Sequence, residues 1–185
     1  IDNKKDNILF LGDSVTQGVG VDSDSSFPAR LACFYNDSIN IINASLTYHH
    51  IKLDFHKPSK TINTTGFPSE FSQVILNILA NAQDVLVQED IKNPFIKIVL
   101  RETKDKVYID IEDNGGGINL SVIDKVFDIY FTTKSKKEGT GLGLYISKLI
   151  IETKLSGEIN VSNSDVGAVF TIELSKDNIL SDEVL

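Results

Sequence analysis

The sequence contains no methionine and a single cysteine, Cys33, among its 185 residues. One thiol excludes an internal disulfide and fits a reducing compartment. The absence of methionine, even at position 1, predicts that the chain is a piece of a longer protein. No apolar run approaches the roughly eighteen residues of a transmembrane helix, and none of signal-peptide length follows the N-terminal lysines. We therefore expect a cytoplasmic segment that makes no membrane contact.

Positive charge is also scarce, with 18 Lys and Arg against 26 Asp and Glu, for a net charge of -8. Nucleic-acid phosphates are bound by clustered Lys and Arg, so this balance argues against a nucleic-acid partner. The apolar share of 41% and the charged share of 24% are typical of a folded domain. The length allows one ordinary domain, or one domain plus a fragment.

Residues 1–48 have a weaker pattern than the rest of the chain. The apolar run Ile8–Leu11 ends at a glycine, which indicates a buried strand entering a turn. Residues 27–35 have apolar positions at helical spacing with a proline near the start, which predicts a short helix. Residues 39–43 indicate a second strand. We expect residues 1–48 to be an N-terminal fragment.

Residues 49–176 are more regular and predict one domain, followed by a tail over residues 177–185. A helix is expected to open at Pro68, because apolar residues from Phe71 to Leu86 recur at the spacing of one buried helical face. The alternation of polar and apolar residues and the turn signals predict strands over 51–55, 96–100, 107–111, 158–161 and 168–174, and a second helix over 140–153. Helices interleaved with a mostly antiparallel sheet predict an α+β two-layer sandwich.

Three segments of this domain suggest nucleotide chemistry. Asn77 and Asn81 are four apart on the first helix, and so share one face. Buried carboxamides need partners, and amide oxygens are ligands that Mg²⁺ accepts. A purely structural role, in which both asparagines bridge neighbouring backbone, is an equal alternative from this segment alone.

The second segment runs from Asp113 through three glycines to Ile118, at the end of a predicted strand. A carboxylate only accepts hydrogen bonds, so Asp113 could receive the amino hydrogens of adenine, although an ordinary tight turn has the same composition. The third segment, Gly139–Leu144, precedes the second helix. Backbone N–H groups at such a glycine-rich helix start favour phosphate oxygens, but the pattern alone is weak.

Together and in this order, the three segments resemble the N box and the two glycine boxes of the GHKL ATPase and kinase superfamily. Residues 126–134 are similar to the F box of sensor histidine kinases, and residues 66–74 resemble the segment before the N box. The resemblance covers residues 51–175. It implies the Bergerat fold, ATP and Mg²⁺ as cofactors, a mobile lid over residues 119–138, and a place within a two-component phosphorelay that could belong to a membrane-bound sensor.

The resemblance also implies roles for individual residues. Asn81 would be the main Mg²⁺ ligand, with Asn77 in support, and Asp113 would bind the adenine amino group. The remaining ATP-binding residues would be Asp84, Gly115, Gly117, Ile118, Phe131, Lys134, Gly139, Thr140, Gly141, Leu142, Gly143 and Leu144. Three positions depart from the family pattern. Asp84 stands where many members have lysine, Ile129 where proline is common, and Ala168 where Thr or Ser is common.

One position discriminates within the superfamily. Members that hydrolyse ATP carry a Glu four residues before the metal-binding Asn, as the base that activates water. Here that residue is Asn77, which cannot accept the proton. The resemblance therefore implies transfer of the γ-phosphoryl group to a histidine on a separate dimerisation hairpin, with a response regulator as downstream partner. His49, His50 and His56 lack the acidic neighbour of such an acceptor, so this chain would be the catalytic half of a kinase.

Residues 7–47 resemble something different, the first block of the GDSL/SGNH hydrolases, in which a strand delivers a nucleophilic serine. By this match Ser14 would be the nucleophile, next to Asp13. A serine needs a base, and neither the Asp-x-x-His nor the Gly-x-Asn-Asp block of that family is present. An inert remnant, joined by engineering, rearrangement or misassembly, is the favoured interpretation. Two alternatives to a kinase remain, a nucleotide-binding module without turnover and a serine esterase acting through Ser14.

Overall fold

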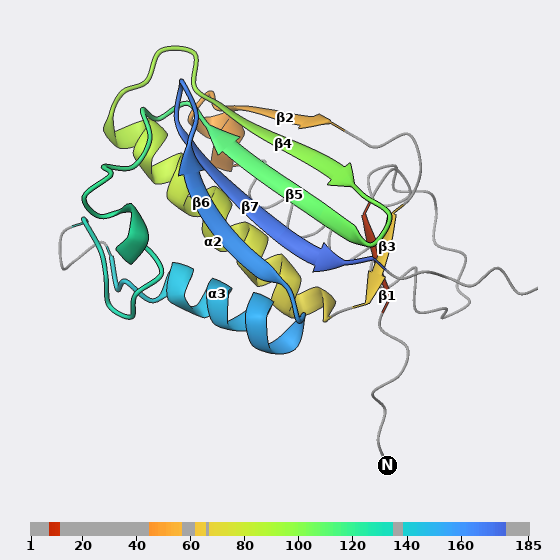
Figure 1. The fold of residues 1–185 in the computed structure, drawn as a ribbon. Helices are drawn as coiled ribbons and strands as arrows, with labels where there is room; N and C mark the ends of the chain where they lie inside the picture. The colour runs from red at the N-terminus through yellow and green to blue at the C-terminus, as the bar shows by residue number, and fades with distance from the viewer. Residues whose placement is uncertain (1–7, 12–44, 57–61, 66, 135–138, 177–185) are drawn as a thin grey trace, which may run out of the picture.

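The computed structural model describes residues 8–11, 45–56, 62–65, 67–134 and 139–176. Within these residues, one sheet has five strands in the order β2-β4-β5-β7-β6, and helices α2 (Pro68–Gln88) and α3 (Gly143–Lys154) cover one of its faces (Figure 1). The strands are β2 (Lys52–His56), β4 (Phe95–Glu102), β5 (Lys106–Asp113), β6 (Glu158–Asn163) and β7 (Ala168–Ser175). The predicted α+β sandwich is confirmed.

The sheet is mostly antiparallel, as predicted. β4 pairs with β5, β5 with β7 and β7 with β6 in antiparallel register, whereas β2 runs parallel to β4 at one edge. Helix α3 begins at Gly143, three residues later than expected. Gly141 has a φ of +65°, a left-handed conformation that an α-helix cannot include. The expected helix over 27–35 and strand over 39–43 lie outside the described residues.

A second, two-stranded sheet pairs β1 (Ile8–Leu11) antiparallel with β3 (Ile62–Thr65). β1 has the predicted bounds, but β3 was not expected, because its residues lack the apolar alternation of a strand. The buried Thr64 hydroxyl donates to the Ser175 carbonyl at 2.6 Å and so ties β3 to the end of β7. This small sheet lies at the end of the domain away from the 3₁₀ helix η2 (Ile123–Lys125) (Figure 1).

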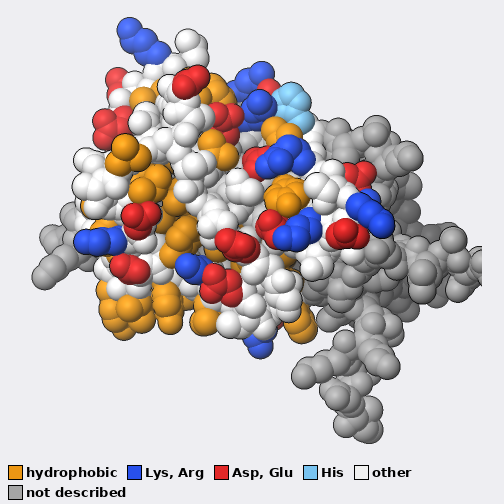
Figure 2. Space-filling model, in the orientation of Figure 1, with side chains coloured by type: hydrophobic (Ala, Val, Ile, Leu, Met, Phe, Trp, Pro, Cys, Tyr) orange, Lys and Arg blue, Asp and Glu red, His pale blue; other side chains and the backbone are white. Residues whose placement is uncertain are grey.

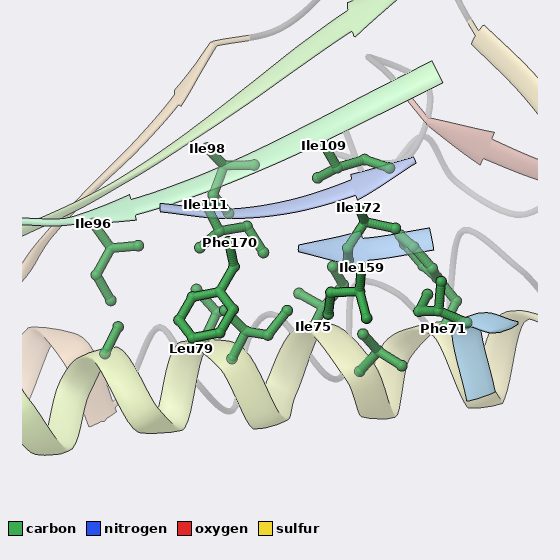
Figure 3. Close-up of a cluster of buried hydrophobic side chains, with 14 of the residues drawn as sticks. Phe71, Ile75, Leu79, Ile96, Ile98, Ile109, Ile111, Ile159, Phe170 and Ile172 are labelled. Atoms are coloured by element: carbon green, nitrogen blue, oxygen red, sulfur yellow. The ribbon is translucent and has the colours of Figure 1, made fainter. Parts of the chain in front are cut away.

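The core lies between α2 and the sheet. Phe71, Ile75 and Leu79 point from α2 toward isoleucines and Phe170 on the strands (Figure 3). Burial of each such side chain stabilises the fold by about 1.5–3 kcal/mol. Leu46, which precedes the expected boundary at residue 48, is 1% exposed and belongs to the same core. The packing therefore fixes α2, and with it both asparagines, against β5 and β7.

The opposite face of the sheet carries polar side chains, with acidic and basic groups interspersed (Figure 2). On β5 the buried Val107, Ile109 and Ile111 alternate with half-buried residues that point the other way. One of these, Asp110, accepts hydrogen bonds from Arg101 at 2.5 and 2.9 Å and from Thr171 at 2.8 Å. Alternation of this kind makes one face of the sheet core and leaves the other to solvent.

Candidate functional site

A cavity of about 340 Å³ opens between α2, the ends of β5 and β7, and the segment that leads from Gly117 into α3. Most of the predicted ATP-binding residues line it, namely Asn81, Asp84, Asp113, Gly117, Ile118, Phe131, Lys134, Gly139, Thr140, Gly141, Gly143 and Leu144. Three predicted residues, Asn77, Gly115 and Leu142, are not part of the lining. The fold thus brings together residues from four separate segments of the chain.

Eight further residues line the cavity without having been predicted as ATP-binding residues: Ala82, Val85, Val122, Val126, Thr132, Thr133, Ala168 and Phe170. Four of them fall in the expected lid over 119–138, and Ala168 is one of the positions that depart from the family pattern. Most of them are apolar, and in the sequence they look like ordinary core positions. Ala82 sits on the apolar face of α2, and Phe170 belongs to the apolar alternation of β7. The sequence signal that could have found them is proximity to the motifs, since Ala82 and Val85 flank predicted residues on the same helix.

Asp113 is the buried polar residue of the cavity lining, with 5% of its surface exposed. Its Oδ1 accepts hydrogen bonds from the backbone N–H of Gly115 at 2.8 Å and of Ala168 at 3.4 Å. Burial raises the pKa of Asp113 above its ordinary value, and the two backbone N–H groups partly oppose that rise. Both N–H groups donate to Oδ1, and this fixes the orientation of the carboxylate.

The glycines after Asp113 are required by close packing. A side chain on Gly115 would collide with Val85 of α2, so Gly115 lets the β5 end approach the helix. Gly117 has a φ of +84°, and its space for a side chain is taken by Asn163. Asn163 in turn brackets Ile118, accepting from its N–H at 2.8 Å and donating to its carbonyl at 2.7 Å. The start of the segment that closes the cavity is therefore anchored to β6.

Residues 119–134, which the sequence predicts as part of a lid, contribute several side chains to the cavity lining. Val126 is buried, and the Phe127 ring packs edge-on against Phe170 at a centroid distance of 6.3 Å. Tyr130 has a φ of 64° and donates its backbone N–H to the Gly141 carbonyl at 3.0 Å. A side chain on Gly141 would meet this Tyr130 backbone. The segment and the glycine-rich loop are thus in direct backbone contact.

The glycine-rich loop leads into α3 at the cavity wall. Gly139, Thr140, Gly141 and Gly143 all line the cavity, and the first backbone N–H groups of α3 have no partner within the helix. Such groups favour an anion at a helix N-terminus. The part of the cavity wall that this loop forms is therefore suited to bind negatively charged oxygens.

Asn77 serves as a bridge between the two helices. Its Nδ2 donates to the Gly143 carbonyl and to the Ser147 Oγ, each at 3.2 Å. The Ser147 hydroxyl also donates to the Gly143 carbonyl at 2.9 Å. This arrangement matches the structural alternative for Asn77, in which the carboxamide satisfies neighbouring backbone.

Asn81, four residues further on, faces the cavity and meets a cation there. The Lys134 ammonium lies 3.3 Å from Asn81 Oδ1 and 2.5 Å from Asp84 Oδ2. Among the residues that the structure describes, no group of three or more His, Cys, Asp or Glu could hold a metal ion by itself. A divalent ion at this place would need oxygens of a bound phosphate beside those of the protein, which is how Mg²⁺ is commonly held. In this structure the cation beside Asn81 Oδ1 is the Lys134 ammonium.

The three histidines lie outside the cavity lining. His49, His50 and His56 are at the β2 edge and are not part of the cavity lining. Ser14 and Asp13 lie outside the described residues. In the part of the chain that is described, no helix is long and apolar enough to cross a membrane.

Comparison with known proteins identifies relatives of the whole site. Residues 66–178 match the model of the family described as histidine kinase-, DNA gyrase B-, and HSP90-like ATPase. The two-component sensor PprA of Pseudomonas aeruginosa is 29% identical over 147 residues, which are 76% of this chain and 15% of that protein. The sensor histidine kinase ZraS of Salmonella typhimurium is 33% identical over 139 residues, 74% of this chain and 28% of that protein. The chain thus spans less than a third of either relative.

Solved structures agree with these relatives. The nucleotide-free catalytic domain of histidine kinase ThkA has a TM-score of 0.66 and 27% identity, over 77% of this chain and 90% of that one. ThkA in complex with the response regulator protein TrrA has a TM-score of 0.62 and 25% identity, over 77% of this chain and 40% of that one. The expected resemblance of residues 7–47 to GDSL/SGNH hydrolases finds no support in the comparisons.

Proposed function

Because the chain belongs to the family of histidine kinase-, DNA gyrase B- and HSP90-like ATPases, we propose that it binds ATP with Mg²⁺ and transfers the γ-phosphoryl group to a histidine on a separate dimerisation hairpin. The observation that carries this proposal is that one cavity joins a buried carboxylate, Asp113, to a glycine-rich helix start and an amide oxygen, Asn81. A metal-nucleotide requires a hydrogen-bond acceptor for the adenine base, an anion site and a cation site at one cavity.

Each end of the nucleotide has a matching part of the cavity. Asp113 would accept a hydrogen bond from the adenine amino group through the carboxylate oxygen that does not receive the two backbone N–H groups. Gly117 would let the backbone approach the base. Residues from Gly139 to Leu144 would receive the phosphates with their N–H groups. Asn81 would hold Mg²⁺, which when bound neutralises phosphate charge in the transfer. Apolar residues such as Val126 and Phe170 would exclude water from the base.

The protein groups beside the proposed phosphate site favour transfer over hydrolysis. Asn77, at the position from which a general base would activate water, has no carboxylate, and its amide nitrogen is hydrogen-bonded to α3. Water would therefore be a poor acceptor, and ATP would persist until an imidazole is presented. That imidazole would come from a partner, since the histidines of the described residues are outside the cavity. A response regulator would take the phosphoryl group afterwards, as the known ThkA–TrrA complex suggests.

The test is a phosphotransfer assay with the full chain, γ-labelled ATP, Mg²⁺ and a purified hairpin domain from a related sensor kinase. We expect acid-labile label on the hairpin, none on its His→Ala variant, and slow release of free phosphate. If nucleotide binds but no hairpin is labelled, the chain is a nucleotide-binding module without turnover. Ester hydrolysis that disappears in Ser14→Ala would instead support an esterase.

A further inference from the structure

Two oxygens of α2 converge on the ammonium of Lys134 inside the cavity. Asn81 and Asp84 are three residues apart and so share a helix face, and Lys134 bridges Asn81 Oδ1 at 3.3 Å and Asp84 Oδ2 at 2.5 Å. The Lys134 side chain is only 19% exposed. The bridge therefore crosses the cavity from the lid segment to the helix that carries the proposed metal ligand.

The carboxylate of Asp84 is in an unusual place for an anion-binding cavity. It lines the same cavity as the glycine-rich loop, where nucleotide phosphates are proposed to lie. A carboxylate beside phosphate oxygens is repelled unless a cation lies between them. In this structure that cation is Lys134. When a nucleotide binds, either the ammonium stays or a metal ion replaces it.

We propose that Asp84 joins Asn81 as a second oxygen of the divalent-cation site, and that the Lys134 ammonium occupies these two oxygens until the metal-nucleotide displaces it. This inference rests on the proposed function. It makes Asp84 the residue through which this chain couples nucleotide affinity to metal, at a position where the resemblance implies a phosphate-binding lysine. The ammonium and a divalent ion exclude each other, because both need Asn81 Oδ1 and like charges repel.

A Lys134 ammonium that leaves Asp84 can bind a nucleotide phosphate instead. Its backbone N–H is held by the Thr132 hydroxyl at 3.1 Å, whereas its four-carbon stem is flexible and its ammonium is a mobile point charge. The lining residues Gly139 and Thr140 face the same cavity. Lys134 can therefore exchange a carboxylate of α2 for a phosphate oxygen without displacement of the lid backbone.

The test compares the dissociation constant of a non-hydrolysable ATP analogue in excess EDTA with that in saturating Mg²⁺, by calorimetry or by competition with a fluorescent nucleotide. The ratio of the two constants is the metal coupling. Asp84→Asn keeps the shape and removes the charge, so it should improve binding in EDTA and weaken binding in Mg²⁺. We expect the metal coupling to fall by about tenfold or more.

Lys134→Gln should move the metal coupling in the opposite direction. Without the ammonium, Asp84 repels phosphate in EDTA, whereas in Mg²⁺ the metal loses a competitor. We expect the coupling to rise several-fold. Glu89→Gln is the matched control, because Glu89 is an exposed acid at the end of the same helix, outside the cavity lining. It removes the same charge and should leave the coupling unchanged.

A different outcome overturns the proposal. If Asp84 only positions Lys134 against phosphate, both cavity variants will weaken binding equally in EDTA and in Mg²⁺, and the coupling will stay constant. Binding by wild type with unchanged coupling in Asp84→Asn contradicts this inference and leaves the proposed function standing. Absence of nucleotide binding by a folded wild-type chain contradicts both.

Discussion

Two parts of the cavity lining, which we call the Asp113 end and the Lys134 end after their polar groups, are held by different kinds of contact. At the Asp113 end, a buried carboxylate is fixed by backbone N–H groups from Gly115 and Ala168, and glycines are packed against α2 and β6. At the Lys134 end, half-buried side chains from the lid and α2 meet through ionic contacts. One end is held by the sheet and the core, and the other by groups that can exchange partners.

This difference assigns different tasks to the two ends. A base is recognised by a donor and acceptor pattern, which needs fixed atoms. Phosphates and a metal arrive with a large charge, which needs groups that can rearrange. We therefore expect substitutions at the Asp113 end to affect affinity for the base whatever the metal, and substitutions at the Lys134 end to act through charge.

The largest effect is expected for Asp113→Asn. The Asn oxygen should remain with the two backbone donors, so its amino group would face the adenine amino group, donor against donor. Affinity for the ATP analogue should fall by about 100-fold or more, in EDTA and in Mg²⁺ alike. Calorimetry measures it, with Glu112→Gln on the neighbouring residue as control. Unchanged affinity in Asp113→Asn would remove the adenine site from this end.

Next in size is the contrast between Gly141→Ala and Gly116→Ala. Both glycines have positive φ, at +65° and +84°. An alanine side chain at Gly141 would meet the Tyr130 backbone, whereas at Gly116 no atom lies within 4 Å. We expect Gly116→Ala to lower the free energy of unfolding by about 1 kcal/mol and Gly141→Ala by about 2–3 kcal/mol. Urea denaturation of both variants measures this, and equal losses would show that the lid does not contact the loop as described.

Asn77→Ala tests the hydrogen bonds that join α2 to α3 beside the cavity. Loss of its hydrogen bonds to Gly143 and Ser147 should lower the free energy of unfolding by about 1–2 kcal/mol. The metal coupling should stay near wild type, in contrast to Asn81→Ala, which should reduce it. If both variants reduced the coupling alike, Asn77 would be a metal-supporting residue, as the resemblance implies.

The smallest effect concerns pH. Because burial raises the pKa of Asp113, the carboxylate is neutralised at a higher pH than an ordinary aspartate. Nucleotide affinity should therefore be full above the raised pKa and decrease a few-fold as pH falls through it. The folded state also binds this proton more tightly than the unfolded state, so the Asp113 contribution to stability falls as pH rises through the same window.

Glu112→Gln provides the control for the pH titration, because the nucleotide itself takes up protons in both proteins. Asp113→Asn should lose the Asp113 component of the pH dependence.

On the far face of the sheet, Asp110 behaves oppositely. Partial burial disfavours its ionised form, but hydrogen bonds from Arg101 and Thr171 outweigh that effect and lower its pKa. Its contribution to stability is therefore present above the unfolded pKa and lost as pH falls through the lowered value. For Asp113, a pH profile of nucleotide affinity in Asp113→Asn that matches the wild-type profile would contradict its assignment to the adenine site.

The parts predicted well from sequence are those with local signals. Proline and apolar spacing define α2, alternation defines β5 and β7, and glycine-rich motifs mark the cavity wall. β3 was missed because Ile62–Thr65 is held by pairing with β1 and by the Thr64 contact to β7, both distant in sequence. The apolar lining, such as Phe170, could not be told from core. The Lys134 bridge joins residues 50 apart, and no local pattern contains it.

Calorimetric titration of the full chain with a non-hydrolysable ATP analogue in Mg²⁺, repeated with the matching GTP analogue, tests whether the cavity binds ATP and selects adenine through Asp113. We expect one binding site per chain for the ATP analogue. Binding of the GTP analogue should be at least about tenfold weaker, because the guanine carbonyl would face the Asp113 carboxylate, acceptor against acceptor. Absence of binding, or equal affinity for both nucleotides, would contradict the proposed ATP site.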